Sequence, residues 1–238
     1  MKKCFRICAA ILIMIALCLG IAAGCTGSVP NDTQTQTDMP QTDVPQTKEP
    51  QTEEPQTEEP SSSDECDALF YGDSITKGNN FDELFPDLRI VDKGINGATI
   101  EDLTQRVDEV DEYHPKKIFV MAGGNNLYSG NVEECVELFR GLLNALKEAC
   151  PYAEIYVESM LPTDKRVAVE YDCPNRVIKG FNERLKALAE ENGMTYVEIY
   201  PAYEKNGGLN KELTFDGIHL KDDAYGPWAD LVRPYLEP

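Results

Sequence analysis

The sequence predicts a single α/β domain, in which helices cover both faces of a five-stranded parallel β-sheet to make three layers. Two observations support this prediction. Short apolar runs alternate with amphipathic segments along residues 66–238, and each of the first three runs is followed by a loop rich in Gly, Asn or Ser. Such alternation is typical of parallel sheets with helices on both sides.

The strands are expected where apolar and β-branched residues occur in short runs. They lie at 67–71, 88–92, 117–121, 153–158 and 194–198. Apolar residues at helical spacing predict helices at 99–110, 131–149, 174–192 and 227–236. Gly193 is expected to end the third helix, and Pro227 falls in the first turn of the last one.

Residues 1–24 have the pattern of an export signal, with basic residues before an apolar stretch from Ile7 to Ala23. The arrangement resembles the lipobox of bacterial lipoproteins, in which Cys25 would carry the lipid, although Ala22 stands where that motif usually has Leu. A retained transmembrane anchor is the alternative, but the apolar stretch is short for one. We therefore expect a lipoprotein anchored to the membrane through Cys25 at a bacterial cell surface.

Residues 25–65 are expected to be a disordered tether. They contain no aromatic residue, and four five-residue units that each begin Pro-Gln-Thr run from Pro40 to Glu59. These units have no apolar face to bury, so they do not predict a repeat fold. Proline and like charges instead predict an extended spacer between the membrane and the folded domain.

The chain is strongly acidic, with a formal net charge of −20. After the basic leader and the acidic tether are set aside, residues 66–238 still carry a net charge of −14. Such a surface argues against nucleic acid as a partner. It also keeps a small domain soluble, which is the simpler meaning.

The cysteine and histidine content predicts no metal site and no cofactor. The chain has two His residues and no Cys-x-x-Cys motif. Four cysteines remain after the leader and Cys25 are set aside, namely Cys66, Cys135, Cys150 and Cys173. If a disulfide forms in an exported domain, Cys135–Cys173 is the first candidate, and four free buried thiols are the equal alternative.

Four loops that should meet at the carboxyl edge of the sheet carry polar residues. They are Gly72-Asp73-Ser74, Asn96-Gly97, Gly123-Gly124-Asn125-Asn126 and Asp216-Gly217-Ile218-His219. Each loop taken alone reads as an ordinary turn. Their joint occurrence at matching positions of one sheet favours a catalytic site.

Ser74 is the candidate nucleophile, and a serine needs a base to accept its proton. His219 can serve as that base, and Asp216, three residues earlier, can orient its imidazole ring. His114 precedes a strand and is expected at the opposite edge of the sheet, so we interpret it as structural. Ester cleavage also needs hydrogen-bond donors for the developing oxyanion, and the candidates are the N–H groups of Ser74 and Gly97 and the amide of Asn125.

The four blocks together resemble those of the SGNH hydrolases, the GDSL-type esterase and lipase family, over residues 66–238. The resemblance implies a flavodoxin-like fold, Ser74 as nucleophile, His219 as base, Asp216 as its orienting acid, and an oxyanion hole of Ser74, Gly97 and Asn125. The chain departs from the family at Asn126, where Asp is usual. Thr76 stands where the nucleophile loop of the larger α/β-hydrolase family would need Gly, which argues against that family.

The export signal, the tether and the compact domain favour an esterase that removes small acyl groups, acetyl above all, from polysaccharide. The alternatives are a lysophospholipase or lipase, and a surface binding module without turnover. Candidate substrate-binding residues are Asp73, Asn126, Tyr128, Arg166, Tyr225 and Trp228. Ordinary packing is the competing interpretation for the aromatic ones.

Overall fold

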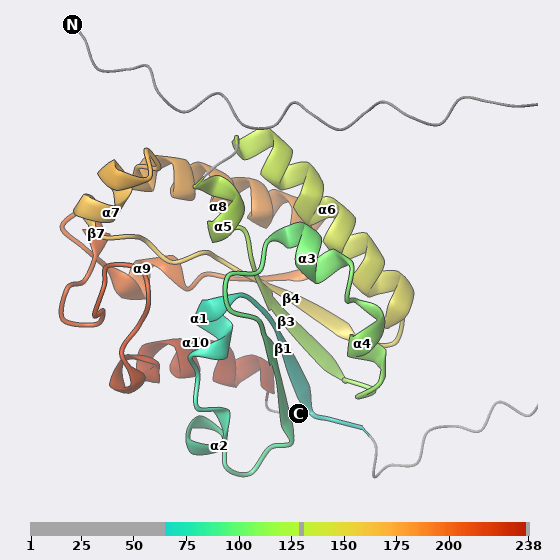
Figure 1. Cartoon of the computed structure of the whole chain (residues 1–238). Coiled ribbons are helices and arrows are strands. Elements are labelled where there is room, and N and C mark those ends of the chain that lie inside the picture. Colours follow the sequence, from blue (N-terminus) through green and yellow to red (C-terminus); the bar gives the residue numbers. More distant parts are fainter. Residues whose placement is uncertain (1–64, 129–130, 237–238) are drawn as a thin grey trace, which may run out of the picture. The chain divides into compact units, whose positions relative to one another are not determined.

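The computed structural model describes residues 65–128 and 131–236. The predicted signal peptide 1–24, the lipid site Cys25 and the tether 25–65, apart from its last residue, lie outside these ranges. The predicted fold class is confirmed, because the described residues form a five-stranded parallel sheet with helices packed on both faces (Figure 1). Among the described residues, no helix is long and apolar enough to span a bilayer.

All five predicted strands are present, within two residues of their expected starts. They are β1 Ala68–Gly72, β2 Ile90–Gly94, β3 Lys117–Met121, β4 Glu154–Glu158 and β5 Thr195–Val197. The order across the sheet is β2-β1-β3-β4-β5, and every pairing is parallel. Because β1 pairs with both β2 and β3, the loops that follow these three strands emerge side by side.

Three of the four predicted helices are confirmed, and the fourth is interrupted. The long ones are α6 Val132–Ala149, α8 Asn175–Glu191 and α10 Gly226–Leu236. The segment 99–110 instead forms α3 Ile100–Thr104 and α4 Asp108–Asp111. The two helices are separated by tighter i→i−3 hydrogen bonds of the 3₁₀ type, such as that from the Arg106 N–H to the Leu103 carbonyl.

Several short elements were not predicted, since few residues define each one. The helices are α1 Ser74–Lys77, α2 Phe81–Leu84, α5 Gly124–Leu127, α7 Lys165–Glu170, α9 Tyr200–Tyr203 and the single turn η1 Asp222–Ala224. An antiparallel hairpin joins β6 Glu204–Lys205 to β7 Gly208–Leu209.

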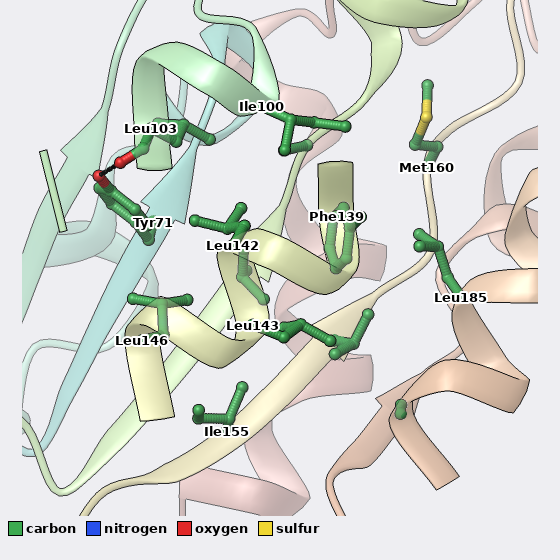
Figure 2. Packing of buried hydrophobic residues seen from close by; sticks show 14 of the residues in the cluster. Tyr71, Ile100, Leu103, Phe139, Leu142, Leu143, Leu146, Ile155, Met160 and Leu185 are labelled. Atoms are coloured by element: carbon green, nitrogen blue, oxygen red, sulfur yellow. Dashed lines mark hydrogen bonds between the residues drawn. The ribbon is translucent and has the colours of Figure 1, made fainter. Parts of the chain in front are cut away.

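The two faces of the sheet bury separate apolar clusters. Alternate residues of a strand point to opposite faces, so Leu69 and Tyr71 enter one cluster while Ala68 and Phe70 enter the other. The first cluster packs against α3, α4, α6 and α8, and Figure 2 shows the α6 side chains within it. The Tyr71 hydroxyl donates a 2.5 Å hydrogen bond to the Leu103 carbonyl there (Figure 2). The second cluster packs against α2, α9 and α10.

The predicted end of α8 at Gly193 is confirmed. Gly193 adopts a positive φ of 67°, which costs glycine little. Its N–H donates to the Glu190 carbonyl, and the Met194 N–H donates to the Ala189 carbonyl. These two bonds form a Schellman motif, which satisfies the last carbonyls of the helix and turns the chain into β5.

Two alternatives were open for the cysteines, a Cys135–Cys173 bridge or four free buried thiols, and Cys66, Cys135, Cys150 and Cys173 are all free and buried. The alternative of four free thiols is the one observed. Cys135 belongs to the buried face of α6, and burial raises the pKa of its thiol to about 11. A thiol that is so rarely ionised at neutral pH reacts slowly with oxidants.

Candidate active site

Ser74 begins the short helix α1 directly after β1. Asp73 caps this helix, since its Oδ1 accepts a 2.9 Å hydrogen bond from the Ile75 N–H. The Tyr225 hydroxyl donates a 2.8 Å hydrogen bond to the Ile75 carbonyl from the far end of the chain. The turn that carries the Ser74 hydroxyl is therefore held from both sides.

Ser74, His219 and Asp216 form a continuous hydrogen-bonded chain. The Ser74 Oγ lies 2.9 Å from His219 Nε2, and His219 Nδ1 lies 2.6 Å from Asp216 Oδ2. Because a carboxylate can only accept, the proton belongs on Nδ1, which leaves Nε2 free to accept the serine proton. This is the geometry of a nucleophile, a general base and an orienting acid.

The Asp216 carboxylate is held in its charged form by several donors. Its Oδ1 accepts hydrogen bonds of 2.8 Å from the backbone N–H groups of Ile218 and His219. Burial alone would raise the pKa of this carboxyl, but the His219 side chain and the two backbone donors outweigh burial and hold the pKa below its ordinary value. Asp216 therefore stays ionised at neutral pH and stabilises a positive charge on His219.

The turn that carries Asp216 and His219 is closed at its base. The Thr214 hydroxyl donates to the His219 carbonyl at 2.6 Å and accepts from the Gly217 N–H at 2.9 Å. Thr214 also forms an antiparallel bridge with Leu220. These contacts fix the spacing that brings the imidazole back towards its carboxylate.

Helix α7 supports the same turn from outside. The Asp164 N–H donates to the Gly217 carbonyl, and the guanidinium of Arg166 donates to the Asp216 carbonyl, both at 2.9 Å. Asp164 also caps α7 by accepting from the N–H groups of Arg166 and Val167. Arg166 is exposed and does not line the cavity, so its expected contact with substrate is replaced by this supporting role.

The three residues with the predicted oxyanion donors, Ser74, Gly97 and Asn125, line the same cavity. Within the described residues, the backbone N–H groups of Ser74 and Gly97 have no hydrogen-bond partner. One N–H of the Asn125 amide donates to the Ala98 carbonyl at 2.8 Å, which fixes the amide plane and leaves its second N–H available. Gly97 has a positive φ of 73°, which turns this loop past the nucleophile.

A cavity of about 980 Å³ opens over these groups. All four polar loops contribute to its lining, among them Ser74, Gly97, Asn125 and His219. A volume of this order is typical of small-molecule sites and has room for an acyl group together with a sugar unit.

Three of the candidate substrate-binding residues do line this cavity, namely Asp73, Tyr128 and Tyr225. Asp73 is almost fully buried, which raises the pKa of its carboxyl to about 6, although the Ile75 hydrogen bond and the nearby His219 lower it in part. Tyr225 faces the nucleophile turn through its hydroxyl, so its first role is to hold that turn.

The expectation that Trp228 contacts substrate is wrong. Its side chain is only 3% exposed, lies outside the cavity lining, and packs edge-on against Phe70, Phe81 and Phe85. The indole ring completes the apolar cluster between the sheet and α10. Although Trp228 follows His219 closely in the sequence, its side chain on α10 is buried in the core.

The expectation that Asn126 contacts substrate is also wrong. Asn126 is buried and lies outside the cavity lining. Its Oδ1 accepts from the Ile100 N–H at 2.9 Å, and its Nδ2 donates to Glu101 Oε2 at 2.6 Å. The residue that departs from the family pattern therefore joins α5 to the start of α3.

The structure adds cavity residues that sequence reasoning missed, above all Phe215 and Tyr171. Phe215 stands directly before Asp216, and an aromatic residue at the start of a polar loop was the available signal. Tyr171 follows α7, and its ring lies 4.9 Å from that of Tyr128. Within the described residues, no group of three or more His, Cys, Asp or Glu side chains is placed to hold a metal ion.

The model of the GDSL-like lipase/acylhydrolase family matches residues 70–226, which span all four polar loops. The chain belongs to this family. The matched range runs from β1 to the start of α10, so it includes both the sheet and the cavity of this acylhydrolase. The comparison with curated proteins found no match.

Solved structures show the same fold as this acylhydrolase. A Streptococcus pneumonia protein provisionally named a platelet activating factor is 26% identical, with a TM-score of 0.64 over 73% of this chain and 85% of that one. A GDSL-like lipase from Bacteroides thetaiotaomicron is 23% identical, with a TM-score of 0.64 over 74% and 90% of the two chains. A catalytic variant of an acetylxylan esterase from Geobacillus stearothermophilus is 20% identical, with a TM-score of 0.58 over 71% and 93%.

Proposed function

We propose that this acylhydrolase is a serine esterase that removes small acyl groups, acetyl above all, from polysaccharide. The observation that carries the proposal is the hydrogen-bonded chain from Ser74 through His219 to Asp216 at the cavity. In catalytic variants of the structurally similar acetylxylan esterase, the replaced residues are a serine, a histidine and an aspartate.

In the first half of the reaction, the Ser74 Oγ attacks the ester carbonyl carbon while His219 Nε2 takes the hydroxyl proton. The carbonyl oxygen becomes an oxyanion, which the N–H groups of Ser74 and Gly97 and the free amide N–H of Asn125 are placed to stabilise. His219 then passes its proton to the alcohol oxygen as the carbon–oxygen bond breaks. The alcohol leaves, and the acyl group remains on Ser74.

In the second half, His219 Nε2 takes a proton from water, and the resulting hydroxide attacks the acyl carbon. The same donors hold the second oxyanion. Its collapse returns the proton to the Ser74 oxygen and releases the carboxylic acid. Asp216 keeps Nδ1 protonated throughout, so one nitrogen of His219 performs every proton transfer.

Two observations and one prediction from the sequence support a small acyl group on a carbohydrate. The cavity has room for a sugar unit beside the acyl group. One protein of the same fold is an acetylxylan esterase. The predicted tether would carry the domain away from the membrane towards extracellular polymers.

The proposed location is the outer surface of a bacterial membrane, where diacylated Cys25 would anchor the chain. The alternative of a non-catalytic binding module rested only on Asn126. Because Asn126 lies outside the cavity lining and joins two helices, that support is removed.

The deciding experiment measures acetate release from acetylated xylan, mannan, pectin and peptidoglycan by the wild-type protein and Ser74→Ala. We expect release from at least one glycan, and a loss of roughly 10³-fold or more in the variant with an unchanged circular dichroism spectrum. Unchanged activity in Ser74→Ala would exclude Ser74 from the mechanism. Faster cleavage of long-chain than of acetyl p-nitrophenyl esters would favour a lipase or lysophospholipase instead.

A further inference from the structure

Two of the four exposed large apolar side chains of the described residues line the cavity. The large hydrophobic residues exposed in this part of the chain are Tyr152, Val169, Tyr171 and Phe215. Tyr171 and Phe215 line the cavity, and Val169 lies on α7, two residues before Tyr171. Tyr152 alone precedes β4 and so lies near the amino edge of the sheet. Two exposed aromatic rings at the rim of a cleft fit a ligand-binding groove.

Phe215 is the most specific member of this group. Its side chain is 70% exposed, yet the turn around it is held by hydrogen bonds on both sides. The Thr214 hydroxyl bonds the His219 carbonyl, and the Asp216 carboxylate accepts from the backbone of the same turn. The ring is therefore presented at the cavity by an ordered segment of chain.

The Phe215 ring lies beside the catalytic base. The ring centroids of Phe215 and His219 are 5.8 Å apart, and their planes differ by 13°. His219 Nε2 must reach the oxygen of the departing alcohol to return its proton. A ring stacked on His219 is consequently next to the alcohol part of the ester.

We propose that Phe215 is a platform for the sugar ring of the alcohol part of the substrate, an inference that rests on the esterase function proposed above. The face of an aromatic ring is electron-rich, and the C–H bonds on one face of a pyranose are weakly positive. The exposed face of Phe215 thus fits a pyranose ring whose esterified oxygen points to His219. Phe215 would select esters of cyclic sugars over esters of simple alcohols with the same acyl group.

The test compares two acetyl esters that differ in the alcohol, peracetylated methyl xylopyranoside and ethyl acetate. The measured quantity is the ratio of kcat/KM for the xyloside to kcat/KM for ethyl acetate. In Phe215→Leu, which keeps an apolar side chain without a π face, we expect this ratio to fall roughly tenfold. Phe215→Trp should retain it. Tyr152→Leu removes an exposed aromatic residue away from the cavity and is the matched control, whose ratio should equal that of the wild type.

Each contrary result has a distinct meaning. An unchanged ratio in Phe215→Leu would overturn the proposal, whether activity on both esters is kept or falls equally. An equal fall with a displaced pH profile would mean that Phe215 acts through His219. If Phe215→Leu lost more kcat/KM on p-nitrophenyl butyrate than on p-nitrophenyl acetate, Phe215 would contact the acyl group, and this result would also overturn the proposal. A wild-type protein that hydrolyses ethyl acetate but not the xyloside would remove the platform and leave the esterase, whereas inactivity on both would remove the esterase itself.

Discussion

The indole Nε1 of Trp228 donates a 2.6 Å hydrogen bond to Oε1 of Glu158, and both side chains are buried. Glu158 is the last residue of β4, and Trp228 lies in the first turns of α10. The bond joins the sheet to the last helix and explains why Trp228 points into the core. Burial raises the pKa of Glu158 to about 8, although the bond from Trp228 lowers it in part.

This pair predicts a pH dependence of stability. The folded protein holds the Glu158 proton up to about pH 8, whereas the unfolded chain releases it near the ordinary value of 4.5. Since the unfolded state binds fewer protons in this window, the free energy of unfolding falls as pH rises from about 4.5 to about 8. In Glu158→Gln this contribution is absent, so the wild type should lose on the order of 3 kcal/mol relative to the variant between pH 4.5 and pH 7.

Urea unfolding at several pH values measures this difference. Glu190→Gln, a change at an exposed position of α8, is the matched control and should follow the wild type. Asp73 adds a dependence of the same sign below about pH 6, but it is common to all three proteins and cancels. Parallel profiles for wild type and Glu158→Gln would show that Glu158 is ionised in the folded protein.

The turn between Asp216 and His219 depends on a glycine. Gly217 has a positive φ of 98°, and an added Cβ would lie 2.9 Å from Val167 Cγ2 and 3.0 Å from Asp164 Cγ. Gly217→Ala should lower the free energy of unfolding by about 1–3 kcal/mol and reduce kcat, because the backbone that carries both residues must shift.

Gly193→Ala is the control for this change. Gly193 also has a positive φ, of 67°, but an added Cβ there would meet no atom within 4 Å. The Gly193→Ala variant should lose about 1–2 kcal/mol of stability, and its kcat should be unchanged. Thermal unfolding and acetyl ester hydrolysis measure the two effects, and equal kcat in both variants would contradict the prediction.

Asn126, the residue that departs from the expected family pattern, donates a hydrogen bond to Glu101. An aspartate at position 126 could still accept from the Ile100 N–H, but it could not donate to Glu101, and two carboxylates would meet. Asn126→Asp should therefore lose about 1–2 kcal/mol of stability at neutral pH. Adding Glu101→Gln should recover most of it, which a double-mutant cycle by urea unfolding measures. Additive effects of the two changes would show that the contact contributes nothing.

The proposed lipid anchor makes a prediction about location. Cys25→Ser removes the thiol that a lipid would modify, so the protein should move from the membrane fraction to the medium. Immunoblots of the two fractions measure the shift. Ser28→Ala, a change close to Cys25 in the same segment, should leave the distribution as in the wild type. A Cys25→Ser protein retained in the membrane would favour an uncleaved apolar anchor.

The polar loops could be predicted from the sequence because a parallel sheet brings the carboxyl ends of its strands to one edge. Ser74, Asn96 and Asn125 each follow an apolar run, so their common edge was implied before any contact was known. The stripes on α6 and α8 were equally readable, because their period of 3.6 residues is a local property.

The side chains whose placement was predicted wrongly or missed are those whose neighbours come from distant parts of the chain. Trp228 and Phe215 flank His219 in the sequence, yet the first turns into the core and the second is exposed at the cavity. The direction of each side chain depends on packing partners, Glu158 for one and His219 for the other. The break in the predicted helix 99–110, in contrast, comes with local i→i−3 hydrogen bonds such as that from Arg106 to Leu103.

For this protein, the sequence by itself determined the succession of the five parallel strands and the three long helices along the chain, the family, and the residue types of a nucleophile, a base and its oxyanion donors. Periodicity and motif spacing are local properties of the chain, so they can be recognised without knowledge of the fold. Only the tertiary structure decided that Asn126 joins two helices, that Trp228 belongs to the core and that Phe215 stands beside the base. Those placements follow from contacts across long stretches of chain, which no local pattern encodes.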